Sequence, residues 1–415
     1  MANAGPQLSI VSFPKDAYLT VEGKPNADHF YIIRAGNVRI TSEVPMANEN
    51  DSGPLAPGDF FGVVSTMSSH SHVETAMAQS DVSLISVHRD QFGLLIQRNT
   101  PVAINIILEF SRRMRYLDEA LTRVSFKSTA DEGPAHLFTV AEYYARQNQF
   151  NQAFYAYYRY LQYCSDGEHA PVAKERLDKI KPYAKAVHLS SSDVTDSMGR
   201  TYPKNTMIFS EGEPGGEMFI IQKGRVKISK IVDDQEILIA LLKPGEFFGE
   251  MALLENKPRS ASAIAHDDEV TVLVVNKDNF GRMVQTQAQL ITRLTTTLAE
   301  RIWTVKRTLV NAAVGDPLGR LYDQLYLQLE KNRIATDSAA PYTFDFGAKE
   351  LINMVGYSAS DGNVQVQKML ENSKLKLMDN RIHATDVQEI VKQTEYFKRM
   401  EKINKARARG SLKAQ

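Results

Sequence analysis

The first part of the chain alternates short apolar runs with polar positions and glycine turns. Between residues 10 and 92, the runs 30–33, 38–40 and 82–87 are rich in β-branched and aromatic residues. Several short runs of this kind, separated by turns, predict a small all-β domain, either a barrel or a jelly roll. The same pattern returns at about 201–280 and predicts a second domain of this type.

The two β-rich regions match each other along their length. The matching segments are Glu22-Gly23 with Glu211-Gly212, Ile32-Ile33 and Gly36 with Ile220-Ile221 and Gly224, and Pro57-Gly58-Asp59-Phe60-Phe61-Gly62 with Pro244-Gly245-Glu246-Phe247-Phe248-Gly249. From Phe61 to Ala78 the first copy aligns without gaps to Phe248–Ala265. An internal repeat at this separation predicts two copies of one domain.

A long stretch with apolar residues at alternating spacings of three and four follows each β-rich region. These stretches predict helices at about 101–126 and 284–311. Their apolar seams are Ile107, Phe110, Met114, Leu117, Leu121 and Val124 in the first, and Ile291, Leu294, Leu298, Ile302, Val305 and Leu309 in the second. Such a seam is typical of a coiled coil or helix pair, although a helix packed on its own barrel has the same pattern. Gly315-Asp316-Pro317 then ends the second helix and is a candidate hinge, because the residue before proline avoids the α region.

Between the two β-rich regions the pattern changes to helical periodicity with many alanines and aromatic residues. The pattern positions of 133–187 include Leu137, Ala141, Tyr144, Phe150, Ala153 and Tyr157. Small residues at helix crossings, with large residues between them, resemble one tetratricopeptide (TPR) repeat followed by a helix at about 172–184. Repeat proteins usually need about three units for stability, so this segment is either a rigid helical spacer or a protein-docking surface. Residues 188–200, rich in Ser, Asp and Thr, are a predicted linker.

Helical and strand patterns are mixed in residues 318–415. Periodic apolar positions predict helices at 318–329 and 348–355 and a third helix that ends near Leu370, while Tyr342–Phe346 alternates as a strand. Residues 375–383 predict a strand, a turn and a second strand. The tail is basic, with Lys398, Arg399, Lys402, Lys405, Arg407 and Arg409, and either adds salt-dependent phosphate contacts or is simply solvated.

Composition adds few constraints. The 415 residues imply several domains, and the formal net charge of zero gives no sign of a broadly basic, nucleic-acid-binding surface. Cys164 is the single cysteine, which excludes an intrachain disulfide and indicates a reducing compartment. No apolar run approaches the roughly 18 residues of a membrane span, so a cytoplasmic protein is expected. No nucleophile–base pair, metal cluster or carboxylate dyad stands out, so we expect neither an enzyme nor a bound metal.

The chemistry of the chain is concentrated in residues 245–262. Gly249 lets the backbone approach a ligand closely, and the short helix expected at Glu250–Glu255 has an N-terminus that favours anions. Arg259 presents a planar fork suited to phosphate oxygens. Glu250, in contrast, suits a sugar hydroxyl, because a carboxylate accepts hydrogen bonds. Together these residues predict a site for a small phosphorylated ribose of low charge.

This stretch resembles the phosphate-binding cassette of cyclic nucleotide-binding domains. The resemblance implies that Glu250 takes the ribose 2′-hydroxyl and Arg259 the cyclic phosphate. The implied ligand-binding residues are Gly249, Glu250, Met251, Ala252, Arg259, Ser260 and Ala261 in the cassette, with Thr304 and Lys306 of the following helix reaching the base. Ser260 after Arg259 resembles cyclic AMP-binding bacterial members, so cyclic AMP is expected rather than cyclic GMP, with Trp303 as a candidate for stacking on the base. A barrel loop with a surface Arg and Glu is the alternative interpretation.

The first copy of the cassette lacks these side chains. Val63 stands where Glu250 stands and cannot accept a ribose hydroxyl. His72 stands where Arg259 stands and is a weaker, pH-dependent phosphate partner. The first barrel is therefore either a structural or interface copy with an empty pocket, or a site for a different ligand. His70 and His72, on one loop without further ligands, do not indicate a metal site.

Residues 201–385 together resemble the Crp/Fnr family of bacterial regulators, in which such a barrel and long helix precede a winged-helix DNA-binding domain. The supporting segments are Asp316-Pro317-Leu318-Gly319-Arg320, Val355-Gly356-Tyr357-Ser358 and Lys368-Met369-Leu370-Glu371. The resemblance implies a homodimer, for which we favour the second seam, and a recognition helix in the DNA major groove. Candidate DNA contacts on that helix are Ser360, Asn363, Gln365, Gln367 and Lys368. Asp361 and Gly362 depart from the family, since Asp361 would repel phosphates and Gly362 weakens the helix start.

The expected fold is α+β and multidomain, with two jelly-roll-type β-rolls and their long helices, a TPR-like spacer and a winged helix. The expected boundaries are 1–130 for a degenerate first domain, 131–188 for the spacer, 189–315 for the ligand-binding domain, 316–390 for the winged helix and 391–415 for the basic tail. The expected function is a cyclic nucleotide receptor that acts as a Crp/Fnr-type transcriptional regulator. An interaction scaffold that senses the nucleotide and acts on protein partners is the alternative. Kinase regulatory subunits also have tandem barrels, but the sequence has no Arg-Arg-x-Ser/Ala inhibitor segment.

Overall fold

A computed structural model describes residues 8–25, 27–42, 53–126, 133–185, 199–232, 234–337 and 339–412, without the side chains of 124–126, 359 and 405–412. Apart from a short segment at 41–45, the chain divides into two compact units whose boundary falls between Ile302 and Trp303. Of the linker predicted at 188–200, residues 188–198 lie outside the described residues, and 199–200 instead begin a strand. No helix in the described ranges is long and apolar enough to cross a membrane.

The first barrel consists of two antiparallel sheets with the strand orders β1-β7-β3-β5 and β2-β6-β4. Its elements are β1 (Ser9–Phe13), β2 (Tyr18–Thr20), β3 (His29–Ala35), β4 (Val38–Thr41), β5 (Phe60–Phe61), α1 (Val63–Ser68), β6 (Thr75–Ala78) and β7 (Val82–His88). The inward-facing residues of both sheets form one core around Val38, Phe61 and Leu84. The helices η1 (Arg89–Gln91), α2 (Phe92–Arg98) and α3 (Thr100–Phe126) follow.

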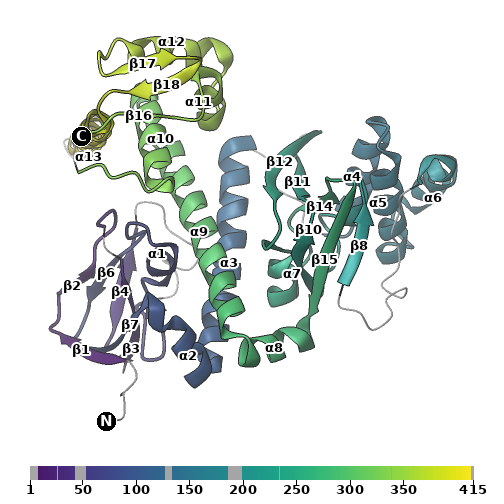
Figure 1. Ribbon diagram of the computed structural model, residues 1–415, viewed down its shortest axis with the longest axis horizontal. Coiled ribbons are helices and arrows are strands. Elements are labelled where there is room, and N and C mark those ends of the chain that lie inside the picture. The colour runs from purple at the N-terminus through teal and green to yellow at the C-terminus, as the bar shows by residue number, and fades with distance from the viewer. Residues whose placement is uncertain are drawn as a thin grey trace. The chain divides into compact units, whose positions relative to one another are not determined.

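The second barrel repeats this arrangement, with sheet orders β13-β10-β15-β8 and β12-β11-β14-β9 (Figure 1). Its elements are β8 (Gly199–Pro203), β9 (Met207–Phe209), β10 (Glu217–Lys223), β11 (Val226–Val232), β12 (Gln235–Leu242), β13 (Phe247–Phe248), α7 (Glu250–Glu255), β14 (Ser262–Ala265) and β15 (Glu269–Asn276). The order β8-β15-β10-β13 is equivalent to β1-β7-β3-β5. The prediction of a duplicated domain is therefore confirmed.

The helix expected at 284–311 is interrupted near its start. Helix α8 (Lys277–Thr286) ends before Gln287, whose backbone leaves the helical region with φ −129° and ψ 60°. Helix α9 (Ala288–Ala312) then continues into the second unit. Apolar periodicity predicted the helical content but not the break at Gln287.

Most of the described residues of the two helix seams are already buried within a single chain. Helix α3 packs against α7 and α8, and α2 also packs against α8. The seam residues Ile107, Phe110, Met114 and Leu117 of α3, and Ile291, Leu294, Leu298 and Ile302 of α9, are 0 to 8% exposed. The part of the second seam in this unit is thus not a free surface, contrary to its expected use as a dimer interface. A homodimer through this seam would first have to uncover it.

The helical segment between the barrels packs on the second barrel. It contains α4 (His136–Arg146), α5 (Phe150–Tyr163), α6 (Ala170–Ile180) and η2 (Lys181–Tyr183). Its tyrosine- and alanine-rich core includes Met207, Ile231 and Ile264 from β9, β11 and β14. The helices predicted at 133–187 are present, and one of their faces is used inside the unit rather than left open for a partner.

In the second unit a small sheet is combined with helices. Its elements after α9 are α10 (Pro317–Lys331), β16 (Tyr342–Thr343), α11 (Ala348–Val355), α12 (Ala359–Leu370), β17 (Leu375–Met378), β18 (Arg381–Ala384) and α13 (Val387–Leu412). The strands form a three-stranded antiparallel sheet in the order β16-β18-β17. Asp316 caps α10 by accepting the Gly319 N–H at 2.8 Å, so the proposed hinge is also a helix start. The strand expected at Tyr342–Phe346 is shorter, with Phe344 and Phe346 turning into the core.

The basic tail is helical rather than simply extended into solvent. The ring of Phe397 on α13 stacks on Tyr322 of α10, with centroids 6.1 Å apart. Lys398 Nζ lies 3.2 Å from Asp323 Oδ1, and Asp323 also interacts with Arg307. Burial alone would raise the pKa of Asp323, but Arg307 and Lys398 outweigh it and hold that pKa below its usual value. Lys398 is therefore engaged within the unit and is not a free cation of the tail.

Candidate functional site

The cassette residues predicted from sequence lie together between β13 and the start of β14. Gly249 precedes α7 with a left-handed backbone, φ 76°. A Cβ at Gly249 would lie 2.7 Å from Arg259 Nη1, so only glycine leaves room for the guanidinium. Met251, Ala252 and Ala261 are at most 9% exposed, and Ser260 Oγ contacts Met251 Sδ at 3.9 Å. The ungapped motif therefore folds into one compact pocket wall.

Arg259 is the buried cation of this pocket. Its side chain is 7% exposed, and its guanidinium carbon lies 4.1 Å from the centre of the Phe209 ring. Nη1 donates to Gly249 O at 2.6 Å, but Nε has no hydrogen-bond partner among the described residues. Burial lowers the pKa of Arg259, although Glu213 opposes this shift. A buried donor without an acceptor costs about 1–3 kcal/mol, so this guanidinium fits an anionic ligand that supplies the acceptor.

Glu213 is a second buried carboxylate beside Arg259, and sequence reasoning did not identify it. Its backbone carbonyl accepts the Arg259 N–H at 2.8 Å. Its carboxylate accepts the Tyr155 hydroxyl of α5 at 3.0 Å and lies 3.2 Å from Arg159 Nε. Burial raises the pKa of Glu213 in spite of Arg159. Helix α5 of the spacer thus supports the backbone that holds Arg259.

Glu250, the expected ribose acceptor, is paired with a residue that the sequence analysis did not name. Its side chain is 3% exposed, and Oε1 lies 3.1 Å from Arg301 Nη1 of α9. Arg301 Nη2 also donates to Phe247 O at 2.8 Å. A ribose hydroxyl that donates to Glu250 therefore has to compete with Arg301 or share the carboxylate with it.

The residues expected at the base belong to the second unit. Thr304, Lys306 and Trp303 follow Ile302 on α9, and Lys306 and Trp303 are 1% and 0% exposed. Their assignment to the base stays a prediction.

The first barrel has a buried carboxylate of its own in the segment that aligns with the cassette. Glu74, the counterpart of Ala261 in the ungapped alignment, is 2% exposed and accepts the Gly62 N–H at 2.9 Å. Arg113 of α3 lies 3.4 Å from the same carboxylate. Val63 is buried, and burial lowers the pKa of His72, opposed by Glu74. An anionic ligand would meet an internal anion here, which argues against the interpretation that the first barrel binds a different phosphorylated ligand.

The alignment places Glu74 opposite Ala261, but it does not indicate what Glu74 does. A lone Glu opposite an Ala gives no sign that it turns inward, and Arg113 lies 39 positions further along the chain. No group of three or more metal-ligating side chains, around His70 and His72 or elsewhere, occurs in the described ranges.

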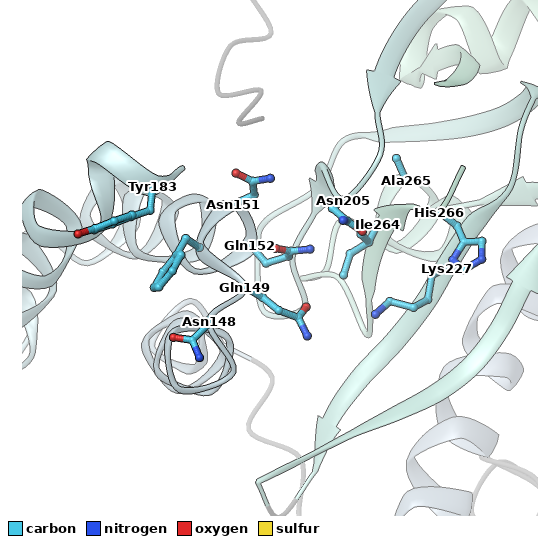
Figure 2. Close-up of a pocket in the computed structure, with 11 residues that line it drawn as sticks. Asn148, Gln149, Asn151, Gln152, Tyr183, Asn205, Lys227, Ile264, Ala265 and His266 are labelled. Atoms are coloured by element: carbon cyan, nitrogen blue, oxygen red, sulfur yellow. The ribbon is translucent and has the colours of Figure 1, made fainter. Parts of the chain in front are cut away.

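A cavity of about 530 Å³ lies away from the cassette, between the spacer and the second barrel (Figure 2). Figure 2 shows the carboxamides of the α4–α5 turn on one side and Asn205, Lys227 and His266 on the other. None of the predicted ligand-binding residues lines this cavity.

The predicted DNA contacts lie on α12. Ser360, Asn363, Gln367 and Lys368 are exposed, and Gln365 is half-buried. Asp361 has a local role at this helix start, since its N–H donates to Ser358 Oγ at 3.1 Å and its carboxylate accepts the same hydroxyl at 2.7 Å. A Cβ at Gly362 would lie 2.4 Å from Ile352 Cγ2, so the glycine permits close packing of α12 on α11. The departures from the family pattern thus have structural causes.

Comparison with known proteins identifies the type of the two β domains. The family model "Cyclic nucleotide-binding domain" matches residues 10–99 and 199–287. A "CRP-like cAMP-activated global transcriptional regulator" of Mycobacterium tuberculosis is 24% identical over 192 residues, which are 46% of this chain and 85% of that protein. The human "cGMP-dependent protein kinase 2" is 41% identical over 91 residues, which are 21% of this chain and 12% of the kinase. The "Cyclic AMP receptor protein" of Thermus thermophilus is 39% identical over 80 residues, which are 19% of this chain and 37% of that protein. The chain thus contains two cyclic nucleotide-binding domains in tandem and is similar to CRP-like regulators.

Proposed function

We propose that the chain is a cyclic AMP receptor that binds one nucleotide, in the second barrel. The observation that carries the proposal is the buried Arg259, whose Nε has no partner among the described residues. A cyclic phosphate has one negative charge and supplies the acceptor, while Glu250 accepts the ribose hydroxyl in competition with Arg301 or together with it. Ser260 beside Arg259, and the relatives named for cyclic AMP, favour adenine over guanine.

Titration calorimetry with cyclic AMP and cyclic GMP tests this proposal. We expect one site per chain, with tighter binding of cyclic AMP. A stoichiometry of two would contradict the assignment to the second barrel, and tighter binding of cyclic GMP would contradict the choice of base.

The second unit acts as a ligand-controlled winged helix on DNA. In support, α11 and α12 form a helix–turn–helix followed by the β17–β18 hairpin, and α12 exposes Ser360, Asn363, Gln367 and Lys368. The regulator acts as a homodimer in the cytoplasm, is not an enzyme, and requires no metal. Because the helix seams of the first unit are covered, the second copy uses another surface or requires α9 to move.

Arg301 provides a physical route from the ligand to the output. A ligand shifts a conformational equilibrium only through contacts that differ between the two states. Arg301 on α9 contacts Glu250, and α9 continues in sequence toward Asp316 and α10. In hydrogen exchange, cyclic AMP should protect 245–262 and also change exchange at 300–320. Protection confined to the cassette would contradict this relay.

A protein-directed scaffold is the second candidate function, and a specific observation favours it. Val364 on α12 is 53% exposed, and Leu377 and Met378 on β17 are 43% and 44% exposed. Exposed apolar side chains gathered in one module are typical of protein contacts. A DNA shift assay at several salt concentrations separates the two functions, because phosphate contacts make DNA binding strongly salt-dependent. No shift at low salt with cyclic AMP present would favour the scaffold.

A further inference from the structure

Helix α3, which follows the first barrel, contacts the cassette of the second barrel through a buried ion pair. Arg115 Nε donates to Glu255 Oε2 at 3.1 Å, and Ser111 Oγ donates to Glu255 Oε1 at 2.7 Å. Arg115 also donates through Nη1 and Nη2 to Pro258 O, each at 3.3 Å. The side chains of Arg115 and Glu255 are 3% and 5% exposed. Solvent therefore screens this pair weakly, and loss of one partner would leave the charge of the other buried and uncompensated.

These contacts join the two ends of the turn that leads from α7 to Arg259. Glu255 is the last residue of α7, and Asn256 after it has a left-handed backbone with φ 55°. Pro258, at the other end of the turn, directly precedes Arg259. Because one guanidinium binds both ends, Arg115 restrains where Arg259 lies relative to α7.

The first barrel has no carboxylate at the equivalent place in its own cassette helix. In the ungapped alignment, Ser68 stands where Glu255 stands. Ser68 Oγ donates to Ser65 O of the same helix at 3.3 Å. A contact that served only the shared barrel fold would be expected in both copies. The carboxylate that Arg115 binds is instead found in the copy that contains Arg259, which associates this contact with the ligand site.

We propose that Arg115 is a positioning residue of the nucleotide site in the second barrel, so that the helix of the degenerate first copy contributes to ligand affinity without binding a ligand. The inference rests on the proposed nucleotide site. A nucleotide that reaches both Glu250 and Arg259 needs these side chains at a fixed separation, and binding groups have to be held within about 0.5 Å of their productive geometry. Glu250 begins α7 and Arg259 follows its end, so the turn that Arg115 restrains sets this separation.

The test is calorimetry with cyclic AMP on the full chain carrying Arg115→Met, which retains a long side chain but donates no hydrogen bond. We expect the affinity to fall about tenfold although Arg259 and Glu250 are both present. Arg115→Lys keeps a positive charge opposite Glu255 and should recover part of the loss. Arg112→Met is the matched control, because Arg112 lies on the same helix with its side chain 64% exposed, and this variant should bind as the unaltered protein does.

Two further measurements distinguish positioning from a loss of stability. Arg115→Met combined with Glu255→Gln removes the buried charge together with its partner, so the free energy of unfolding should recover while the affinity stays low. Recovery of the affinity in this double variant would overturn the inference. In phosphorus NMR at saturating cyclic AMP, only folded and occupied protein contributes the bound signal. Its chemical shift should move toward that of the free nucleotide in Arg115→Met, because Arg259 then meets the phosphate in a different geometry.

The outcomes separate the two proposals. If the unaltered protein binds no cyclic nucleotide, the proposed function fails, and this inference fails with it. If it binds, and Arg115→Met binds equally tightly, only this inference is overturned. Hydrogen exchange in the unaltered protein does not depend on how any variant folds. Because a contact that strengthens ligand binding is itself strengthened by the ligand, cyclic AMP should slow exchange at residues 111–118 of α3, and unchanged exchange there would also overturn the inference.

Discussion

The two barrels have equivalent strand orders but place opposite charges beside the glycine that precedes the cassette helix. In the first, the Glu74 carboxylate binds the Gly62 N–H and is balanced by Arg113. In the second, Arg259 donates to the carbonyl oxygen of the equivalent glycine, Gly249, and its Nε lacks an acceptor among the described residues. In the first barrel, Arg113 balances the buried charge of Glu74. In the second barrel, a ligand would supply the acceptor that Arg259 Nε lacks. One fold thus serves either as structural support or as a receptor, according to the sign of one internal charge.

Helix α3 connects the two barrels through two arginines with different partners. Arg113 pairs with Glu74 in the first barrel, and Arg115 pairs with Glu255 in the second. Residues two apart on a helix point in widely different directions, at about 100° per residue. The helix that balances the internal anion of one copy therefore also positions the cassette of the other, which gives the degenerate copy a structural reason to be retained.

The largest expected effect is on Arg259. Arg259→Ala should cost about 2–4 kcal/mol of nucleotide binding, because a charge-assisted pair with the phosphate is lost. Calorimetry should then detect no binding at micromolar cyclic AMP. His72→Ala, at the equivalent position of the first barrel, should leave the affinity unchanged. Retained binding in Arg259→Ala, or loss of binding in His72→Ala, would reverse the assignment of the two barrels.

The next effect is on the stability of the first barrel. Glu74→Ala removes the acceptor of the Gly62 N–H and leaves Arg113 without this carboxylate, which should lower the free energy of unfolding by about 1–3 kcal/mol. Cyclic AMP affinity should change little. Denaturant unfolding measures the loss, with Glu175→Ala on the exposed surface of α6 as control. An unchanged free energy of unfolding would mean that the Glu74 carboxylate does not stabilise the first barrel.

The glycines before the two cassette helices provide a matched pair. Gly62 and Gly249 have φ values of 79° and 76°, so alanine at either position introduces similar backbone strain, about 1–2 kcal/mol. The surroundings differ, since an added Cβ lies 3.7 Å from the nearest atom at Gly62 but 2.7 Å from Arg259 Nη1 at Gly249. Gly249→Ala should weaken nucleotide binding by about tenfold, a cost of about 1.4 kcal/mol. Gly62→Ala should not, and equal affinities in the two variants would contradict the placement of Arg259.

The smallest expected effect is the pH dependence of the first barrel. Burial lowers the pKa of His72 from 6.5, so the folded barrel disfavours the protonated ring. Stability should be complete above about pH 6.5 and fall as the pH decreases toward the lowered pKa, because only the unfolded chain takes up the proton in that window. Calorimetric melting between pH 7.5 and pH 5.5 should show a shallower slope for His72→Ala. Identical slopes would show that this histidine does not contribute.

Local and repeated features were predictable from the sequence. The ungapped match of Phe61–Ala78 with Phe248–Ala265 required two equivalent β structures, and their equivalent strand orders confirm it. The cassette from Gly249 to Ala261 also assembled as expected, since its residues are close in sequence and a single turn and helix bring them together. The helices of the second unit followed from apolar periodicity. The helical tail did not, because Phe397 and Lys398 are held by α10 rather than by a local pattern.

Amino-acid pattern alone thus established two copies of one domain, the position of the cassette, and the loss of its Glu and Arg in the first copy. Which charge each pocket contains, and what balances it, depends on partners far apart in the chain. Glu74 meets Arg113, Glu250 meets Arg301, and Arg115 reaches Glu255 across 140 positions. The two apolar seams were likewise recognised, but only burial in the folded chain shows that they are covered without a second copy. A pattern records which residue types can meet, whereas packing in three dimensions selects which of them do.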